Sequence, residues 1–219
     1  MTHASLLTKI CGLSTPETLI AALDAGADMI GLVQFPPSPR HVDLGKAAEL
    51  AALARGRASV VVLTVNPDDA LIDAILKAVS PDFIQLHGKE TVDRVAEVRR
   101  RIPVIKALGI ATAEDVAAAR AYDGAADYLL LDAKPPKDAT RPGGLGQAFD
   151  WSLLDSFKVG TSVLLSGGLH PTNVAEAISR VRPEGVDVSS GVESAPGVKD
   201  KAKIEAFLIN ARAAAGSMR

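Results

Sequence analysis

The sequence predicts a single (β/α)8 barrel over residues 1–219, with eight parallel strands inside and helices outside. Short β-branched or leucine-rich runs alternate with alanine-rich helical stretches along the chain, which is typical of repeated βα units around a parallel sheet. The run 60–63 is apolar at every position, as expected for a strand buried on both faces. No Pro/Gly/Ser-rich linker divides the chain, so we expect one domain with its active site at the carboxyl ends of the strands.

The expected strands are mostly apolar segments bounded by polar residues or glycine. They are 6–11, 29–33, 59–65, 83–86, 104–108, 128–132, 162–166 and 186–189. An open, doubly wound sheet is the alternative, and it usually carries a Gly-x-Gly-x-x-Gly turn after its first strand. Here Cys11, Gly12, Leu13 and Ser14 follow instead, which favours the barrel.

Helical signals occupy the segments between the strands. Ser14 and Thr15 before Pro16 and Glu17 are typical of a capped helix start. Apolar residues recur at helical spacing in 68–79, and similar patterns occupy 90–101, 112–121, 171–181 and 200–215. The segment 132–149 is long for a βα loop and rich in glycine near its end, which predicts either a lid or a plain connecting loop.

Composition excludes several classes of function. The net charge is −2, and no Lys/Arg cluster is interleaved with aromatic residues, so we expect no nucleic-acid partner. The N-terminus lacks a secretory signal, and no apolar run approaches the ~20 residues of a membrane helix, so we expect no membrane partner. Cys11 is the only cysteine, which rules out an internal disulfide and favours the reducing cytoplasm. We expect a small-molecule substrate and a monomer rather than a homodimer.

Two strand ends carry groups suited to acid/base chemistry. Asp132 closes an apolar strand, where a carboxylate is costly unless it faces a polar cavity, so it is a candidate general acid. A loop cap is the alternative for Asp132. Cys11 closes the first strand and is a candidate base, since a thiolate near cationic groups is accessible at neutral pH. A lone cysteine is otherwise most often a small buried hydrophobe.

Glycines follow the seventh and eighth strands, where barrels commonly bind phosphate. Gly167 and Gly168, together with Ser190 and Gly191, let backbone N–H groups approach phosphate oxygens. The alternative is that these glycines only make tight turns.

Arg40 follows a proline-rich loop in which a guanidinium is preorganised to bind a carboxylate in a bidentate pair. The alternative is a solvated loop residue. Gln85 and His87, at the end of the fourth strand, are further candidates for ligand contact, although a hydrogen bond within its loop is the favoured interpretation of His87. The histidines show no metal-ligand spacing, so we expect no metal and no cofactor.

Together these segments resemble the phosphoribosylanthranilate isomerase family, from Lys9 to about Phe207. The resemblance rests on short motifs in a fixed order, which are KICG at 9–12, SPR at 38–40, QLHG at 85–88, LLD at 130–132, GGLG at 143–146, LSGGL at 165–169 and VDVSSGVE at 186–193. Two positions depart from the family, because Gln34 stands where an aromatic is usual and Leu145 where Asn or Thr is frequent.

The resemblance implies an Amadori rearrangement of N-(5-phosphoribosyl)anthranilate to 1-(2-carboxyphenylamino)-1-deoxyribulose 5-phosphate, in tryptophan biosynthesis, without metal or redox partner. It implies that Asp132 protonates the ring oxygen and that Cys11 removes the proton from C2. It further implies substrate contacts from Arg40 to the anthranilate carboxylate, from Asp187 as an orienting group, and from the glycine loops, namely Gly143, Gly144, Gly167, Gly168, Ser190 and Gly191. Two other functions stay open, which are another phosphate-binding barrel enzyme (a sugar-phosphate epimerase or a histidine-pathway aldose-ketose isomerase) and a non-catalytic sugar-phosphate sensor.

Overall fold

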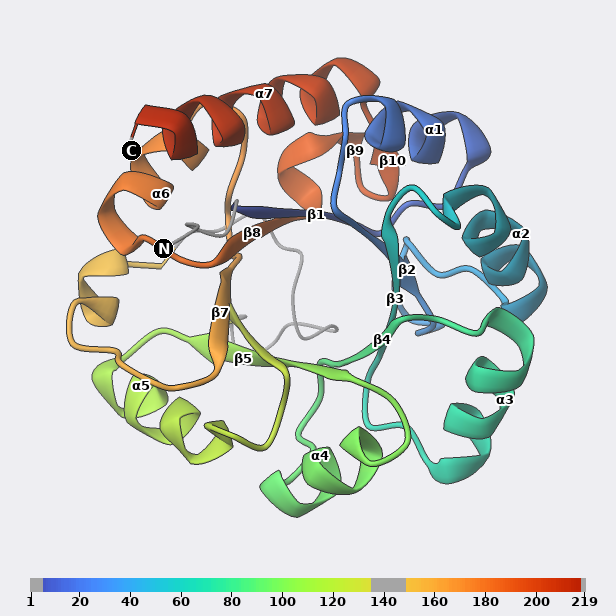
Figure 1. Cartoon of the computed structure of the whole chain (residues 1–219), viewed down its shortest axis with the longest axis horizontal. Coiled ribbons are helices and arrows are strands. Elements are labelled where there is room, and N and C mark those ends of the chain that lie inside the picture. Colours follow the sequence, from blue (N-terminus) through green and yellow to red (C-terminus); the bar gives the residue numbers. More distant parts are fainter. Residues whose placement is uncertain (1–5, 135–148, 218–219) are drawn as a thin grey trace.

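The strands close into a parallel barrel in the order β1 to β8, with the helices arranged around its outside (Figure 1). The computed structural model describes residues 6–134 and 149–217. Each strand pairs with the next along the chain, and β1 pairs with β8 to close the ring. The prediction of eight parallel strands with outer helices is therefore confirmed.

The strand bounds follow the apolar runs closely. They are β1 Leu7–Cys11, β2 Met29–Val33, β3 Ser59–Thr64, β4 Phe83–Leu86, β5 Val104–Ile110, β6 Tyr128–Ala133, β7 Ser162–Leu165 and β8 Gly185–Val188. Strand β5 runs two residues beyond the predicted end at 108, because Gly109 and Ile110 pair with the last two residues of β6. Strand β8 begins one residue early at Gly185, which pairs with both of its neighbouring strands.

Helices fill most of the intervals between strands. They are α1 Pro16–Asp24, α2 Leu44–Ala54, α3 Asp69–Val79, α4 Val92–Arg99, α5 Ala113–Ala119, α6 Val174–Val181 and α7 Lys201–Ser217. Helix α4 begins two residues after the predicted start at 90, because the Thr91 side chain caps it by accepting from the backbone N–H of Arg94. Short 3₁₀ turns lie at Arg120–Tyr122, Trp151–Leu154 and Ser190–Val192, and a small hairpin follows β8, made of β9 Glu193–Ala195 and β10 Val198–Lys199.

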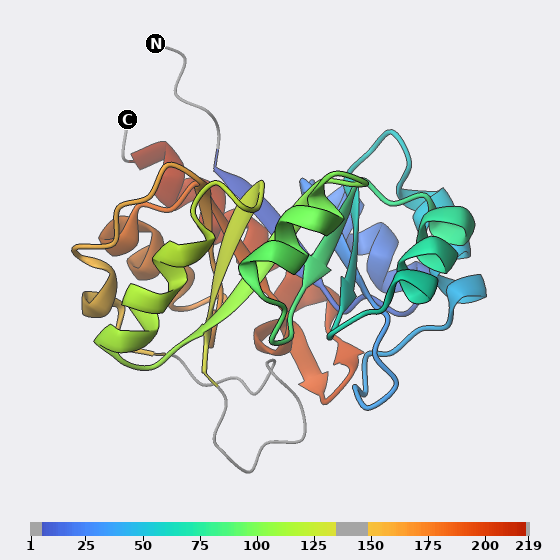
Figure 2. The same ribbon diagram turned by 90° about the horizontal axis from the view of Figure 1, so that it is seen from below.

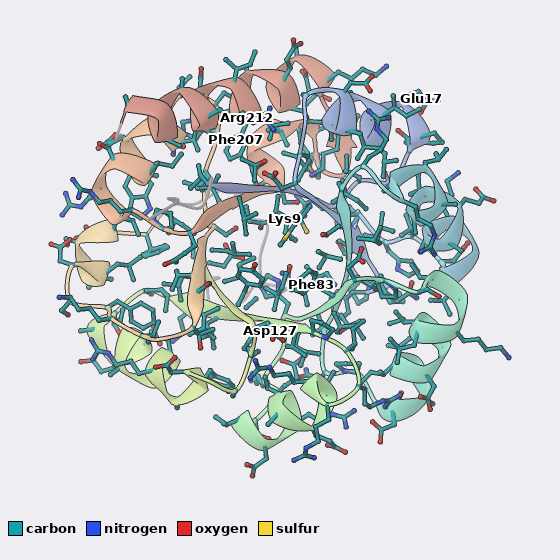
Figure 3. The ribbon with its side chains drawn as sticks, in the orientation of Figure 1. Lys9, Glu17, Phe83, Asp127, Phe207 and Arg212 are labelled. Atoms are coloured by element: carbon teal, nitrogen blue, oxygen red, sulfur yellow. The ribbon has the colours of Figure 1, made fainter. Side chains whose placement is uncertain are left out.

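Side chains alternate along each strand between the barrel interior and the helices. The large apolar core lies between strands and helices, where Phe207 of α7 is fully buried (Figure 3). A smaller apolar cluster fills the barrel itself and consists of Met29, Val61, Ile105, Ala107, Leu130 and Leu164. Phe83 and Tyr128 pack against it edge to face, with ring centroids 5.8 Å apart. The lower barrel is thus a filled core, which leaves the carboxyl ends of the strands for polar side chains.

Acidic residues join the amino ends of the strands in pairs. Asp28 accepts a hydrogen bond from the backbone N–H of Thr8, at 2.8 Å. The same arrangement recurs from Asp82 to Val60, from Asp127 to Val104 and from Glu184 to Val163. In each case a carboxylate just before an even-numbered strand holds the preceding odd-numbered strand, so this end of the barrel is built for stability.

No helix in the described parts of the chain is long and apolar enough to cross a membrane.

Candidate active site

Cys11 lies at the carboxyl end of β1 in a small apolar cluster with Val33 and Leu63, next to Phe35. Its side chain fits there because Gly31 stands opposite on β2, where a Cβ atom would lie 2.8 Å from the sulfur. Cys11 is 3 % exposed, and this burial raises the pKa of its thiol above the ordinary value of 9.0. Phe35, which follows Gln34, packs against this cluster, and the effect of the departure at Gln34 on substrate binding stays a prediction.

Lys9 precedes Cys11 by two residues and therefore points to the same side of β1, into the barrel. Its ammonium lies 2.7 Å from Oδ1 of Asp187 on β8, and the other carboxylate oxygen of Asp187 accepts from the Ser166 hydroxyl at 2.9 Å. Burial lowers the pKa of Lys9, but the charges of Asp187 and Cys11 outweigh burial and raise the pKa overall. Asp187 thus holds Lys9 and Ser166, and its expected contact with substrate stays a prediction.

Asp132 lies near the end of β6 and faces His87 from the loop after β4. Its Oδ2 atom is 3.3 Å from Nε2 of His87, and its Oδ1 atom accepts from the backbone N–H of Ala133 at 2.9 Å. The amide nitrogen of Gln85 lies 3.2 Å from Nδ1 of His87, so the imidazole lies between Gln85 and Asp132. The buried Oε1 atom of Gln85 has no hydrogen-bond partner among the described residues and can accept from a ligand.

Arg40 is buried rather than solvated, with an exposed fraction of 4 %. Its Nε and Nη2 atoms donate to the two carboxylate oxygens of Glu193, at 2.6 and 2.8 Å. Lys199 also binds Glu193 at 2.8 Å and donates to the backbone carbonyl of Ser189. Burial raises the pKa of Glu193, but Arg40 and Lys199 outweigh it and keep the pKa below 4.5. A bidentate pair thus fixes the guanidinium, while the aliphatic carbons of Arg40 lie against Gly12, which follows Cys11.

The two glycine loops lie against each other. Gly167 and Gly168 have φ of +81° and +65°, a conformation that favours glycine. A Cβ atom on Gly167 would overlap the backbone N of Ala133, next to Asp132, and one on Gly191 would overlap the carbonyl oxygen of Leu169. The structure therefore brings the loops after β7 and β8 together, beside the carboxyl end of β6.

A series of neighbouring residues links the two predicted catalytic residues around one side of the barrel. Lys9, two residues before Cys11, binds Asp187, which accepts from Ser166. Gly167, which follows Ser166, lies against Ala133, which follows Asp132. Figure 1 shows the same neighbourhood, with β8 and β7 between β1 and β6 around the ring. The short hairpin β9–β10, which carries Glu193 and Lys199, projects from the lower edge of the molecule in Figure 2.

Gly143 and Gly144, and with them Leu145, lie outside the described residues, so their contacts stay predictions. Within 6–134 and 149–217, no group of three or more His, Cys, Asp or Glu side chains is arranged to hold a metal ion.

Comparison with known proteins identifies the family. A family model described as N-(5'phosphoribosyl)anthranilate (PRA) isomerase matches residues 8–210. The chain is 57 % identical over 217 residues to the N-(5'-phosphoribosyl)anthranilate isomerase of Nitrobacter hamburgensis, covering 98 % of this chain and 96 % of the relative. The chain belongs to the phosphoribosylanthranilate isomerase family.

Solved structures of phosphoribosylanthranilate isomerases share the fold. The enzyme from Thermotoga maritima superposes with a TM-score of 0.85 at 37 % identity, covering 95 % of this chain and 99 % of that one. A second structure of the family, in complex with reduced 1-(o-carboxyphenylamino)-1-deoxyribulose 5-phosphate, has a TM-score of 0.82 at 34 % identity, with coverage of 95 % and 99 %. The resemblance inferred from the short motifs is confirmed.

Several residues of the site were not singled out from the sequence. Lys9 could have been found, because a lysine within an apolar strand, two residues before the candidate base, must be paired when buried. Phe35 had a weaker signal as one of few aromatics in a chain with 4 % aromatic residues. Glu193 and Lys199 had none, since nothing local shows that they meet Arg40.

Proposed function

We propose that this protein isomerises N-(5'-phosphoribosyl)anthranilate to the 1-amino-1-deoxyribulose 5-phosphate by acid/base catalysis, with Asp132 as acid and Cys11 as base. The observation that carries the proposal is the presence of a buried thiol, a buried carboxyl and two adjoining glycine loops at the carboxyl ends of the barrel strands. The family membership and the relatives named for this reaction support it.

The first step opens the sugar ring. Asp132 donates a proton to the ring oxygen while the C1–O bond breaks, and the lone pair of the anthranilate nitrogen forms the C1=N bond of a Schiff base. His87 lies 3.3 Å from Oδ2 of Asp132 and orients this carboxyl relative to the substrate.

The second step moves a proton from carbon. Cys11, as a thiolate, takes the proton from C2, and the electron pair of the C–H bond forms the enolamine while the imine nitrogen gains electron density. Tautomerisation of the enolamine gives the ketone. Both steps are proton transfers, which this site performs with groups of its own.

The two anionic ends of the substrate fit the two positively polarised parts of the site. Arg40, fixed by Glu193, is placed to attract the anthranilate carboxylate, and the backbone N–H groups of Gly167, Gly168 and Gly191 suit the phosphate. Gly143 and Gly144 complete the proposed contacts from the loop after β6.

The decisive experiment follows the fluorescence of phosphoribosylanthranilate with the purified protein and with its Cys11→Ala and Asp132→Asn variants. Loss of each proton-transfer group is expected to lower kcat by roughly 10²- to 10⁴-fold. Binding without turnover by the unmodified protein would favour a sugar-phosphate sensor, and turnover of a different sugar phosphate alone would favour another barrel enzyme. Full activity of either variant would refute the assigned role.

We further propose that the protein acts in the cytoplasm as a monomer. The lone thiol is buried in the site, and the exposed large apolar residues of the described chain, Ile20, Leu53, Val198 and Ile209, lie on four separate elements rather than on one. Sedimentation equilibrium at micromolar concentration tests the monomer.

A further inference from the structure

Lys9 lies in the barrel interior with its ammonium between two strands (Figure 3). It is 1 % exposed, and its partner Asp187 is 4 % exposed. An ammonium in such surroundings is costly unless it is paired, and Asp187 at 2.7 Å provides the pair. The reaction steps above give Lys9 no part, although it is the nearest buried cation along β1 to the sulfur of Cys11.

The charged groups around Cys11 differ between the elements that pack on it. Lys9 projects from β1 to the same side as Cys11, two residues away, and its charge lowers the pKa of the thiol. Lys199 on β10 also lowers this pKa by its charge, and Asp187 on β8 raises it. Arg40 lies against Gly12 through its aliphatic carbons, and its guanidinium shares the carboxylate of Glu193 with Lys199. The contacts from β2 and β3 are apolar, through Gly31, Val33 and Leu63. Among the charged neighbours of Cys11, Lys9 thus lies on the same strand face and has the largest effect on the pKa of the thiol.

We propose that Lys9 is a positioning residue for the isomerisation: its ammonium stabilises the thiolate of Cys11, and Asp187 with Ser166 holds that ammonium in place. The inference rests on the proposed role of Cys11 as base. When the thiolate takes the C2 proton, a neutral thiol forms and Lys9 keeps its charge, still paired with Asp187. The same buried pair therefore serves before and after the proton transfer.

Each charged neighbour shifts the pKa of Cys11 in the direction that its charge requires, while burial is the largest effect and keeps this pKa above 9.0 overall. Burial raises the pKa of the Cys11 thiol, Lys9 lowers it, and Asp187 raises it by less than Lys9 lowers it. Lys9 and Asp187 therefore act on the sulfur in opposite directions, although each stabilises the other. If the role of Lys9 is electrostatic, loss of Lys9 and loss of Asp187 will shift the pKa of Cys11 in opposite directions; if the pair is only structural, they will not.

The test measures the rate of alkylation by iodoacetamide as a function of pH, which reports the thiolate directly because Cys11 is the only cysteine. In Lys9→Met, the half-point of the pH profile is expected to rise by about one pH unit or more, as for the loss of an opposite charge. In Asp187→Asn, the half-point is expected to fall, because the thiolate becomes the counter-ion of Lys9. Half-points that move in the same direction in both variants, or that do not move, would overturn the proposal.

Lys106 offers a matched control. It is another buried lysine, on β5, paired with Glu90 at 2.7 Å. Lys106→Met is expected to lower stability without moving the half-point of Cys11 alkylation, and a shift equal to that of Lys9→Met would overturn the proposal. If Lys9→Met does not fold, the double variant Lys9→Met/Asp187→Asn removes both charges together, and its half-point is still expected to rise because the effect of Lys9 is the larger.

Turnover gives a second, separate readout. Lys9→Met is expected to lower kcat with a smaller change in KM, and a raised KM with unchanged kcat would overturn the proposal. The alkylation profile requires no turnover, so it decides the role of Lys9 even where the proposed reaction fails.

Discussion

The imidazole of His87 bridges Asp132 and Gln85, with Nε2 at 3.3 Å from the carboxylate and Nδ1 at 3.2 Å from the amide nitrogen. Gln85 lies on β4, His87 in the loop after β4 and Asp132 on β6, so the contact joins parts of the chain that are distant in the sequence. The arrangement holds the carboxyl of the proposed acid against the imidazole, and the amide of Gln85 contacts the other side of that ring.

Replacement of His87 should therefore impair the acid more than substrate binding. In His87→Phe, kcat is expected to fall by about tenfold or more with a smaller change in KM, since Asp132 loses its orienting partner. Gln85→Leu should give a weaker effect in the same direction. Steady-state kinetics on both variants checks this, and a change confined to KM would show that His87 contacts substrate instead.

Glu193 should control the affinity for substrate through Arg40. In Glu193→Gln, the guanidinium loses its bidentate anionic partner, and KM is expected to rise by roughly tenfold while kcat changes less. Glu184→Gln is the matched control, because Glu184 accepts a hydrogen bond at the amino end of the strands, away from the site. Equal effects of the two substitutions on KM would contradict the role of Glu193.

The same carboxylate should make stability depend on pH. Burial raises the pKa of Glu193, but Arg40 and Lys199 outweigh it and lower the pKa below 4.5, so the ionised form stabilises the folded state. This stabilisation is fully present above pH 4.5 and is lost as the pH falls through the lower pKa of the folded state. Urea unfolding at several pH values between about 6 and 3 should therefore show the unmodified protein losing stability more steeply than Glu193→Gln. Parallel curves would contradict the prediction.

Gly167 should matter for phosphate binding beyond its backbone conformation. Gly167→Ala places a Cβ against the backbone of Ala133 and moves the loop after β7, so KM is expected to rise by about tenfold and competitive inhibition by inorganic phosphate to weaken. Gly124 has a similar φ of +75° with open space around it, and Gly124→Ala should cost about 1 kcal/mol of stability with unchanged kinetics. If both variants show the same kinetics, the phosphate assignment is wrong.

The strands could be located from the sequence because each is a short run of consecutive apolar residues, which is visible without knowing any partner strand. The predicted bounds of β2 and β4 match the structure at both ends, and those of the other barrel strands differ by one or two residues. The extensions of β5 and β8 arise at Gly109 and Gly185, where a partner strand rather than the local sequence decides whether a glycine joins the ladder. Asp132 and Cys11 are candidates for the same local reason, since each is a reactive group at the end of an apolar strand.

The partners of the site residues could not be predicted in this way. The sequence predicted Arg40 as a ligand-binding residue and gave no partner for it within the protein. In the structure Arg40 donates to Glu193, 153 positions away in the sequence. Lys9 donates to Asp187, 178 positions away. Pairing of β1 with β8 brings Lys9 to Asp187. The hairpin β9–β10, which follows β8, brings Glu193 to Arg40.

Residue order alone thus set the number of barrel strands, their direction and the candidates for the acid and the base, because hydrophobic periodicity and strand-end chemistry are properties of adjacent residues. Only the closed barrel decided which charges lie together around them. Electrostatic interactions depend on distance in space, and that distance exists only once the two ends of the chain have met.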